Sequence, residues 1–365
     1  MATKRSEPRF IWGMSANNCR YITLSQPAKG GARWKTFFSV ALILATVLPI
    51  VAVLAAPMHQ GIVTSVNFLV ALGATHVFAT TYLFTDPAVR SYIKAHPVRM
   101  GVVPLILLFG GIALLSIPSS PLFYAAVLGF FVYQTWHFGA QNIGVATFVS
   151  FTDRGRPLLP AEKTAIKCGI VCGMLGILKG MAPGYFVGPE NMQMSEETLW
   201  LIDGAFRLGA ISAALTAAAA VYFMLRAWRE KYWLTGVSLF LSICFLLPMY
   251  IGRDYMVGIG STAIAHGLQY LIFLSVHSGA NKPAGLNWRY GVFIAPAMLL
   301  LIVLFGHMLW SRAPTYKPDS LPTVGIAVLF SLTLVHFWLD QYLWRMKDKD
   351  RASWIKERFA FIFAR

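Results

Sequence analysis

Four histidines in otherwise apolar stretches are the residues of this chain whose chemistry is easiest to name. They are His76, His137, His266 and His336. Neutral imidazole nitrogens are common ligands of iron, copper and zinc. A polar side chain in an apolar interior costs free energy unless it finds a hydrogen-bond partner or a metal ion. The four histidines therefore predict a metal centre, with non-haem iron as the first expectation and copper or haem as alternatives.

Polar residues accompany these histidines at or near helical spacing. Side chains three or four positions apart share one face of a helix. The polar neighbours of this kind are Thr80, Gln134, Gln141, Asn142, Gln269 and Asp340. Such groups commonly hold a ligand histidine in place through its second ring nitrogen. We expect catalytic roles for Asp340, Gln141 and Gln269, and roles in binding the cofactor for Gln134, Asn142 and Thr80.

Ten apolar stretches must position these residues, and each is long enough to cross a bilayer as a helix of about 20 residues. They are 37–57, 61–85, 100–117, 121–150, 164–182, 198–226, 232–250, 256–277, 290–311 and 321–344. The chain is 57% hydrophobic and 13% charged, whereas about a quarter of the residues of a soluble domain are charged. Length and composition together predict an all-α, polytopic transmembrane helix bundle of about ten helices.

The charge distribution predicts how this bundle is oriented. The net charge is +16, and the basic residues are scattered between apolar stretches, which favours a topological role over nucleic-acid binding. Basic residues follow the even-numbered stretches, so we expect both termini in the cytoplasm. Residues 1–36 then form a basic cytoplasmic tail, 37–345 the bundle and 346–365 a basic segment along the inner surface. We expect a multi-pass protein of the bacterial inner (cytoplasmic) membrane, with the lipid bilayer and an apolar small molecule as partners.

The four histidines all fall on even-numbered stretches, which run in the same direction. Each lies roughly 10–16 residues from the outer end of its stretch, so a common depth is expected. His277 falls near a helix end and is expected to lie outside this layer and to tolerate alanine. The segments that begin at His76 and His336 share a Tyr-Leu-aromatic pattern and a basic exit, which indicates a weak internal duplication.

Other features of the sequence carry less chemistry. The chain has no HExxH, GxSxG, Walker A or CxxCH motif, which removes the usual peptidase, hydrolase, nucleotide and c-type haem interpretations. Cys168 and Cys172 are expected to pack as small apolar residues, with zinc or redox chemistry as the alternative. Asp203 and Arg207 are four residues apart and are expected to pair with one another.

The gathering of histidines from several membrane helices resembles the membrane-embedded carotene-cleaving dioxygenases of the Brp/Blh type. That resemblance implies a non-haem-iron oxidoreductase acting on an apolar lipid or isoprenoid substrate. The arrangement is also similar to that of the haem A synthases, which would imply a haem-binding membrane protein in electron transfer or haem modification. A transporter with a polar midmembrane path is a further alternative.

Overall fold

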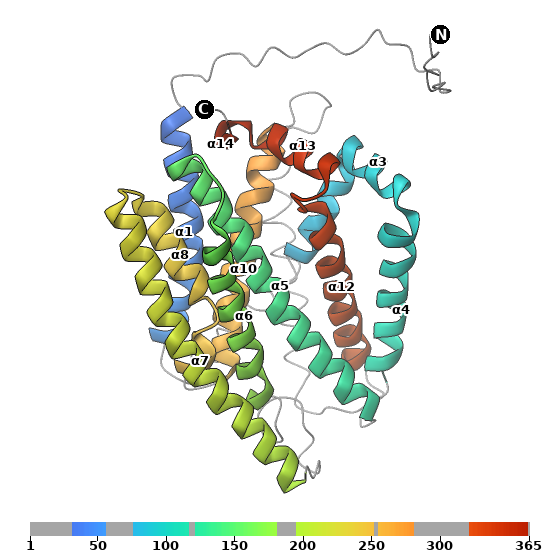
Figure 1. Ribbon diagram of the computed structural model, residues 1–365. Helices are drawn as coiled ribbons and strands as arrows, with labels where there is room; N and C mark the ends of the chain where they lie inside the picture. Colours follow the sequence, from blue (N-terminus) through green and yellow to red (C-terminus); the bar gives the residue numbers. More distant parts are fainter. Residues whose placement is uncertain are drawn as a thin grey trace, which may run out of the picture.

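A computed structural model describes residues 31–55, 76–116, 121–180, 195–251, 255–280 and 321–363. Every regular element in these ranges is helical, and the long helices stand side by side as a bundle (Figure 1). Four stretches are long and apolar enough to cross a membrane, namely Arg33–Ala52, Val98–Leu115, Glu196–Arg229 and Gly258–His277. The predicted all-α class is therefore confirmed for the described residues, and its apolar helices are compatible with membrane insertion.

The helices follow the predicted apolar stretches closely. The long ones are α1 (Gly31–Ala55), α4 (Val103–Leu115), α5 (Pro121–Arg154), α6 (Pro160–Gly180), α7 (Glu196–Arg229), α8 (Trp233–Ile243), α10 (Tyr255–Ala280) and α12 (Leu321–Leu343). The short ones are η1 (Thr80–Thr85), α3 (Pro87–Ala95), η2 (Val98–Val102), α9 (Pro248–Ile251), α13 (Lys349–Arg358) and α14 (Ala360–Phe363). The predicted helix 290–311, most of 61–85 and the tail before residue 31 lie outside the described residues, so the count of ten stays a prediction.

The prediction of one continuous helix over 232–250 is wrong. The structure ends α8 at Ile243, and a turn leads to the short α9, which begins at Pro248. Proline has no backbone N–H, its ring clashes with the carbonyl four residues earlier, and it disfavours helical geometry in the residue before it. The break is therefore a direct effect of Pro248 on the last turn of α8.

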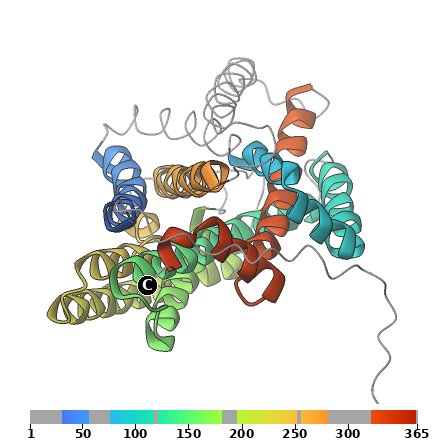
Figure 2. The same cartoon turned by 90° about the horizontal axis from the view of Figure 1, so that it is seen from above.

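Helices α5 and α10 lie in the interior of the bundle, where they bring its two sides together. Helix α5 packs against α6 and α8 on one side and against α4 and α12 on the other. Helix α10 packs against α1, α5 and α9. Figure 2, which looks along the bundle, shows α10 enclosed between α1 on one side and η1 and α12 on the other. A side chain on the inner face of α5 or α10 can therefore reach partners from both sides.

The two ends of the bundle differ in charge. Helices α5, α7 and α12 all finish at the end that α13 and α14 cover (Figure 1). Arg154, Arg229 and Arg345 lie at or just beyond these helix ends, while α7 begins at the opposite end with Glu196 and Glu197. This asymmetry is what the predicted orientation requires, and the cytoplasmic placement of both termini stays a prediction.

The C-terminal segment packs onto the bundle instead of presenting its aromatic side chains outward. Trp354, Ile355, Phe359 and Ile362 are all buried. Phe359 packs against Phe148 of α5 and Phe273 of α10, with ring centroids 5.1 and 5.7 Å apart. The expected segment along the inner surface is thus a cap over one end of the bundle.

Asp86 fastens this cap to the bundle. Its side chain is buried and caps α3 by accepting from the Ala88 N–H at 2.8 Å. Its Oδ2 accepts from Trp354 Nε1 at 3.0 Å and Arg358 Nη2 at 2.9 Å, and His277 Nε2 lies 3.3 Å from the same oxygen. Burial by itself would raise the pKa of Asp86, but the contacts from His277, Trp354, Ala88 and Arg358 outweigh it and hold the pKa well below its usual range.

Two residues singled out in the sequence have partners from distant segments. His277 is fully buried against Asp86 and Trp354, so alanine at this position would remove packed contacts, and its expected tolerance of alanine stays a prediction. Asp203 pairs with Lys179 of α6, with Oδ1 and Nζ 3.3 Å apart, and not with Arg207 as expected. In both cases the partner comes from a distant part of the chain.

Replacing Asp86 by asparagine should lower the free energy of unfolding by about 2 kcal/mol, because charge-assisted hydrogen bonds are lost.

The folded-state pKa of Asp86 lies below that of an unfolded aspartate, about 3.9. Its contribution is thus fully present above about pH 4 and is lost as the pH falls through the folded-state pKa. Thermal unfolding in detergent between about pH 7 and about pH 3 would show a steeper loss for the wild type than for Asp86→Asn. The matched control is Asp203→Asn, an exposed ion pair worth less than about 1 kcal/mol. Equal effects of the two substitutions would contradict the fastening role.

Candidate metal centre

The structure brings the four histidines singled out in the sequence together from four segments. His76 lies in the helical turn before η1, and His137, His266 and His336 lie on α5, α10 and α12. All four are buried. Their rings form a closed circuit, with centroid distances of 4.8 Å from His76 to His266, 4.9 Å on to His137, 5.5 Å on to His336 and 4.6 Å back to His76.

Three of these four distances are those expected of neighbouring imidazoles around one ion, and the fourth, from His137 to His336, is longer. A nitrogen bound at about 2.1 Å puts its ring centre about 3.2 Å from the ion, so neighbouring rings of a four-coordinate centre lie about 4.5–5.2 Å apart. Two groups have ligand atoms that all lie within 4.8 Å of one another. They are His76 with His266 and His336, and His137 with His336 and Asp340. His336 belongs to both groups and so stands where a shared ion would be held.

Several ring nitrogens in this cluster lack a hydrogen-bond partner among the described residues. They are both nitrogens of His266 and the Nε2 atoms of His137 and His336. A buried polar atom without a partner costs about 1–3 kcal/mol. The cost arises four times in one place, on the nitrogens of three neighbouring histidines. One metal ion could supply the missing partner for one nitrogen of each of these three rings.

A chain of hydrogen bonds links His336 to Asp340 by way of two hydroxyl groups. Thr80 Oγ1 lies 2.7 Å from His336 Nδ1 and 2.8 Å from the Tyr270 hydroxyl. Tyr270 donates to Asp340 Oδ1 at 3.0 Å. Asp340 Oδ2 also lies 3.7 Å from His336 Nε2. The predicted site residues Thr80 and Asp340 therefore both act on one histidine, although they come from different segments.

Tyr270 was not among the residues predicted from the sequence. It lies four positions after His266, so the spacing that pointed to the other polar neighbours applied to it as well. Its ring also packs beside His336, with centroids 5.4 Å apart. Aromatic residues are common in membrane helices as apolar packing groups, which is why its hydroxyl gave no distinct signal.

The predicted amides form a separate network beside the histidines. Gln141 Nε2 donates to the carbonyl of His266 at 3.0 Å and to Gln269 Oε1 at 2.9 Å. Gln269 Nε2 donates to Asn142 Oδ1 at 3.2 Å and to Thr46 Oγ1 at 2.8 Å. These bonds join α5, α10 and α1 to each other and not to an imidazole ring. They hold the helices that carry His137 and His266 in register, and the predicted catalytic roles of Gln141 and Gln269 stay predictions.

Gln134 lies one turn before His137 and is buried. Its Oε1 has no hydrogen-bond partner among the described residues. Its predicted role in binding a cofactor remains a prediction. The unsatisfied oxygen shows that the polar character of this part of α5 extends beyond the histidine itself.

Aromatic rings enclose the cluster. Phe337 stacks on His137 with centroids 4.3 Å apart, and Phe138 lies 4.4 Å from His266. Phe138 and Phe337 are both buried. An apolar shell of this kind limits the access of water and strengthens electrostatic interactions inside it.

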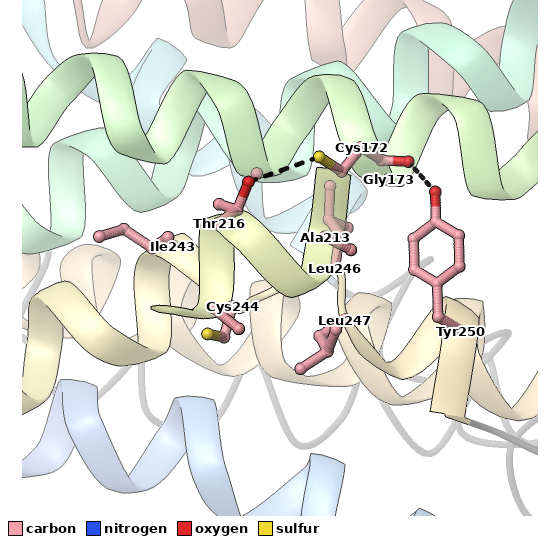
Figure 3. A pocket seen from close by; sticks show the side chains of 11 residues that line it. Cys172, Gly173, Ala213, Thr216, Ile243, Cys244, Leu246, Leu247 and Tyr250 are labelled. Atoms are coloured by element: carbon pink, nitrogen blue, oxygen red, sulfur yellow. Dashed lines mark hydrogen bonds between the residues drawn. The ribbon is translucent and has the colours of Figure 1, made fainter. Parts of the chain in front are cut away.

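A small cavity elsewhere in the bundle is a separate feature. It lies between α6, α7 and the turn after α8, and Cys172, Thr216, Cys244 and Tyr250 are among its lining residues (Figure 3). Its volume of about 10 Å³ is close to the least that can hold one water molecule. Cys172 Sγ lies 3.6 Å from Thr216 Oγ1, and the Tyr250 hydroxyl donates to the Cys172 carbonyl. These contacts fit the expected packing role of Cys172.

Comparison with known proteins gives no relative from which a function could be transferred. No family model matches the chain, and neither a curated protein nor a solved structure matches it. The histidine cluster is consequently the feature on which an assignment of function must rest.

Proposed function

We propose that this protein is an integral membrane metalloprotein in which His76, His137, His266 and His336 bind one metal ion. The observation that carries the proposal is the convergence of four buried imidazoles, of which His137, His266 and His336 have ring nitrogens without a hydrogen-bond partner in the described part of the chain. A buried ring nitrogen without a hydrogen-bond partner destabilises the folded protein. Coordination of a metal ion by one nitrogen of each ring would offset that cost.

Non-haem iron is the metal we propose first. Three or four neutral nitrogens with a carboxylate nearby suit ferrous iron, and copper or zinc accepts similar donors. An ion of this kind, buried among apolar helices, is suited to oxidation of an apolar lipid or isoprenoid substrate that arrives through the bilayer. In this proposal the protein's own groups hold the ion, exclude water through Phe138 and Phe337, and keep His336 oriented through Thr80.

The ring distances favour a single ion over haem. In a bis-histidine haem the two axial imidazoles lie on opposite faces of the macrocycle, which occupies the space around the iron. Here each of the four rings has two others of the cluster within 5.5 Å of its centroid. A flat porphyrin would have to separate rings that are neighbours around the whole circuit. We therefore keep haem as an outcome of the test and not as the proposal.

Metal analysis with an absorption spectrum of the detergent-purified protein tests this function. About one equivalent of iron per chain and no Soret band is the expected result. A Soret band would replace the single ion by haem, and one equivalent of copper or zinc would change the metal and leave the site. A protein that neither contains nor takes up any of these metals would overturn the proposal and favour a polar path through the membrane.

Asp340→Asn is expected to lower metal affinity by about 10–100-fold, which is the usual cost of losing a group that supports a ligand. Asparagine keeps the size and one acceptor of Asp340 but removes the charge near His336. Affinity is measured by titrating the metal-free protein with Fe²⁺ or Co²⁺. The control is Glu230→Gln, which neutralises a carboxylate in a surface pair with Arg226. Unchanged affinity in Asp340→Asn would show that the carboxylate does not support the centre.

The proposed setting is a ten-helix, multi-pass protein of the bacterial inner membrane with both termini in the cytoplasm. The charge difference between the two ends of the bundle supports this orientation, because basic residues collect on the cytoplasmic side of membrane proteins. The covered end of the bundle, with α13 and α14, would then face the cytoplasm.

A further inference from the structure

Hydrogen bonds connect His336 to Asp340 in a chain whose donor-to-acceptor direction is fixed at the Asp340 end. Its members come from three parts of the chain: Asp340 and His336 on α12, Tyr270 on α10 and Thr80 on η1. Every one of these side chains is buried. Buried side chains have few alternative hydrogen-bond partners. Which group donates in each bond therefore follows from how many protons each side chain carries.

The Tyr270 hydroxyl donates its one proton to Asp340 Oδ1. The oxygen of Tyr270 is then left to accept, and Thr80 must give its proton to Tyr270. Thr80 in turn must accept from His336, which places the proton of the imidazole on Nδ1. The carbonyl of His76 competes for the Thr80 proton only at 3.3 Å, against 2.8 Å for Tyr270.

A neutral imidazole carries one N–H, so a proton on Nδ1 leaves a lone pair on Nε2. Nε2 is the nitrogen of His336 without a hydrogen-bond partner among the described residues, and it lies beside the other histidines. From this geometry we propose that Thr80 and Tyr270 are positioning residues that hold His336 in the tautomer able to bind the metal ion. This inference rests on the proposed function and adds to it a means by which the site is kept ready.

Substitution of Thr80 tests the inference. Thr80→Val keeps the shape and removes the hydroxyl, so the tautomer of His336 is no longer fixed. Thr80→Ser keeps the hydroxyl and restores the circuit. In titrations of the metal-free, detergent-purified full chain with Co²⁺ or Zn²⁺ alone, we expect Thr80→Val to lose about 10–100-fold in affinity and Thr80→Ser to stay close to the wild type. Thr333→Val is the matched control, because the Thr333 hydroxyl donates within α12 to the carbonyl of Leu329.

A second variant separates the circuit from simple packing. Tyr270→Phe breaks the same circuit one step further on, so the double variant Thr80→Val/Tyr270→Phe should lose no more affinity than either single variant. Losses that add, or failure of Thr80→Ser to restore affinity while thermal unfolding shows a folded protein, would overturn the inference. Wild-type affinity in Thr80→Val overturns it too but leaves the metal centre standing. A wild-type chain that binds neither ion overturns both the inference and the proposed function.

Discussion

Metal binding should be lost when His266 is replaced by alanine. His266 is fully buried, has two of the other histidines within 4.9 Å of its ring centroid, and has no hydrogen-bond partner for either ring nitrogen among the described residues. Removing a group that merely supports a ligand costs about 10–100-fold in affinity, so removal of a ligand should cost more than about 100-fold. Metal content after purification and titration with Co²⁺ would both report the loss.

The controls for this experiment separate metal binding from folding. His266→Gln keeps more of the volume of the side chain than alanine does, so a cavity is not the cause if it loses metal as well. His96→Ala removes a histidine outside the cluster, at the end of α3, where Nδ1 lies 3.0 Å from the carbonyl of Tyr92. Full metal content is expected in His96→Ala. Equal losses in His96→Ala and His266→Ala would contradict a site built on the four histidines.

Gly169→Ala should destabilise the bundle by about 3 kcal/mol or more, because an added methyl group would overpack a close helix contact. A Cβ atom at Gly169 would lie 2.2 Å from the carbonyl oxygen of Ile243, at the end of α8. The obstacle is backbone and cannot swing aside, so α6 and α8 would have to move apart. Small residues allow such close approach of helices in membranes. Thermal unfolding in detergent measures the effect.

Gly129→Ala is the matched control for this substitution. Gly129 also lies inside a long helix, α5, but nothing comes within 4 Å of the position that its Cβ would take. Alanine favours the helix over glycine by about 1 kcal/mol, so the control should leave stability unchanged or raise it. A similar loss of stability in both variants would mean that helix contact at Gly169 is not what limits it.

Most helices of the bundle could be predicted from the sequence, because local composition specifies helices in lipid. Apolar runs of the right length predicted α5 and α12 to within a few residues, since every backbone polar group in lipid must be satisfied inside its own helix. The convergence of the histidines was predicted by counting residues from the outer end of apolar stretches that run in the same direction. Local patterns of this kind are visible without knowledge of the neighbouring helices.

What the sequence could not supply were the partners that come from distant segments. Thr46 is a lone polar residue in α1, and only the packing of α1 on α10 shows that it bonds Gln269. Asp86 and His277 lie far apart in the chain, and no periodicity links them. The end of α8 depended on how strongly one proline acts in the last turn of an apolar run. Tertiary packing decides the first two, and the local effect of Pro248 decides the third.

The cap formed by α13 and α14 is also the last part of the described bundle to be synthesised. Phe359 reaches the chain exit only after α1, α5 and α10 have been synthesised, yet its ring packs among Phe38, Phe148 and Phe273 of those helices. Domains assemble from the N-terminus as synthesis proceeds, so this end of the bundle stays open until its last helices arrive. During that interval Phe38, Phe148 and Phe273 lack the ring that packs among them in the complete bundle.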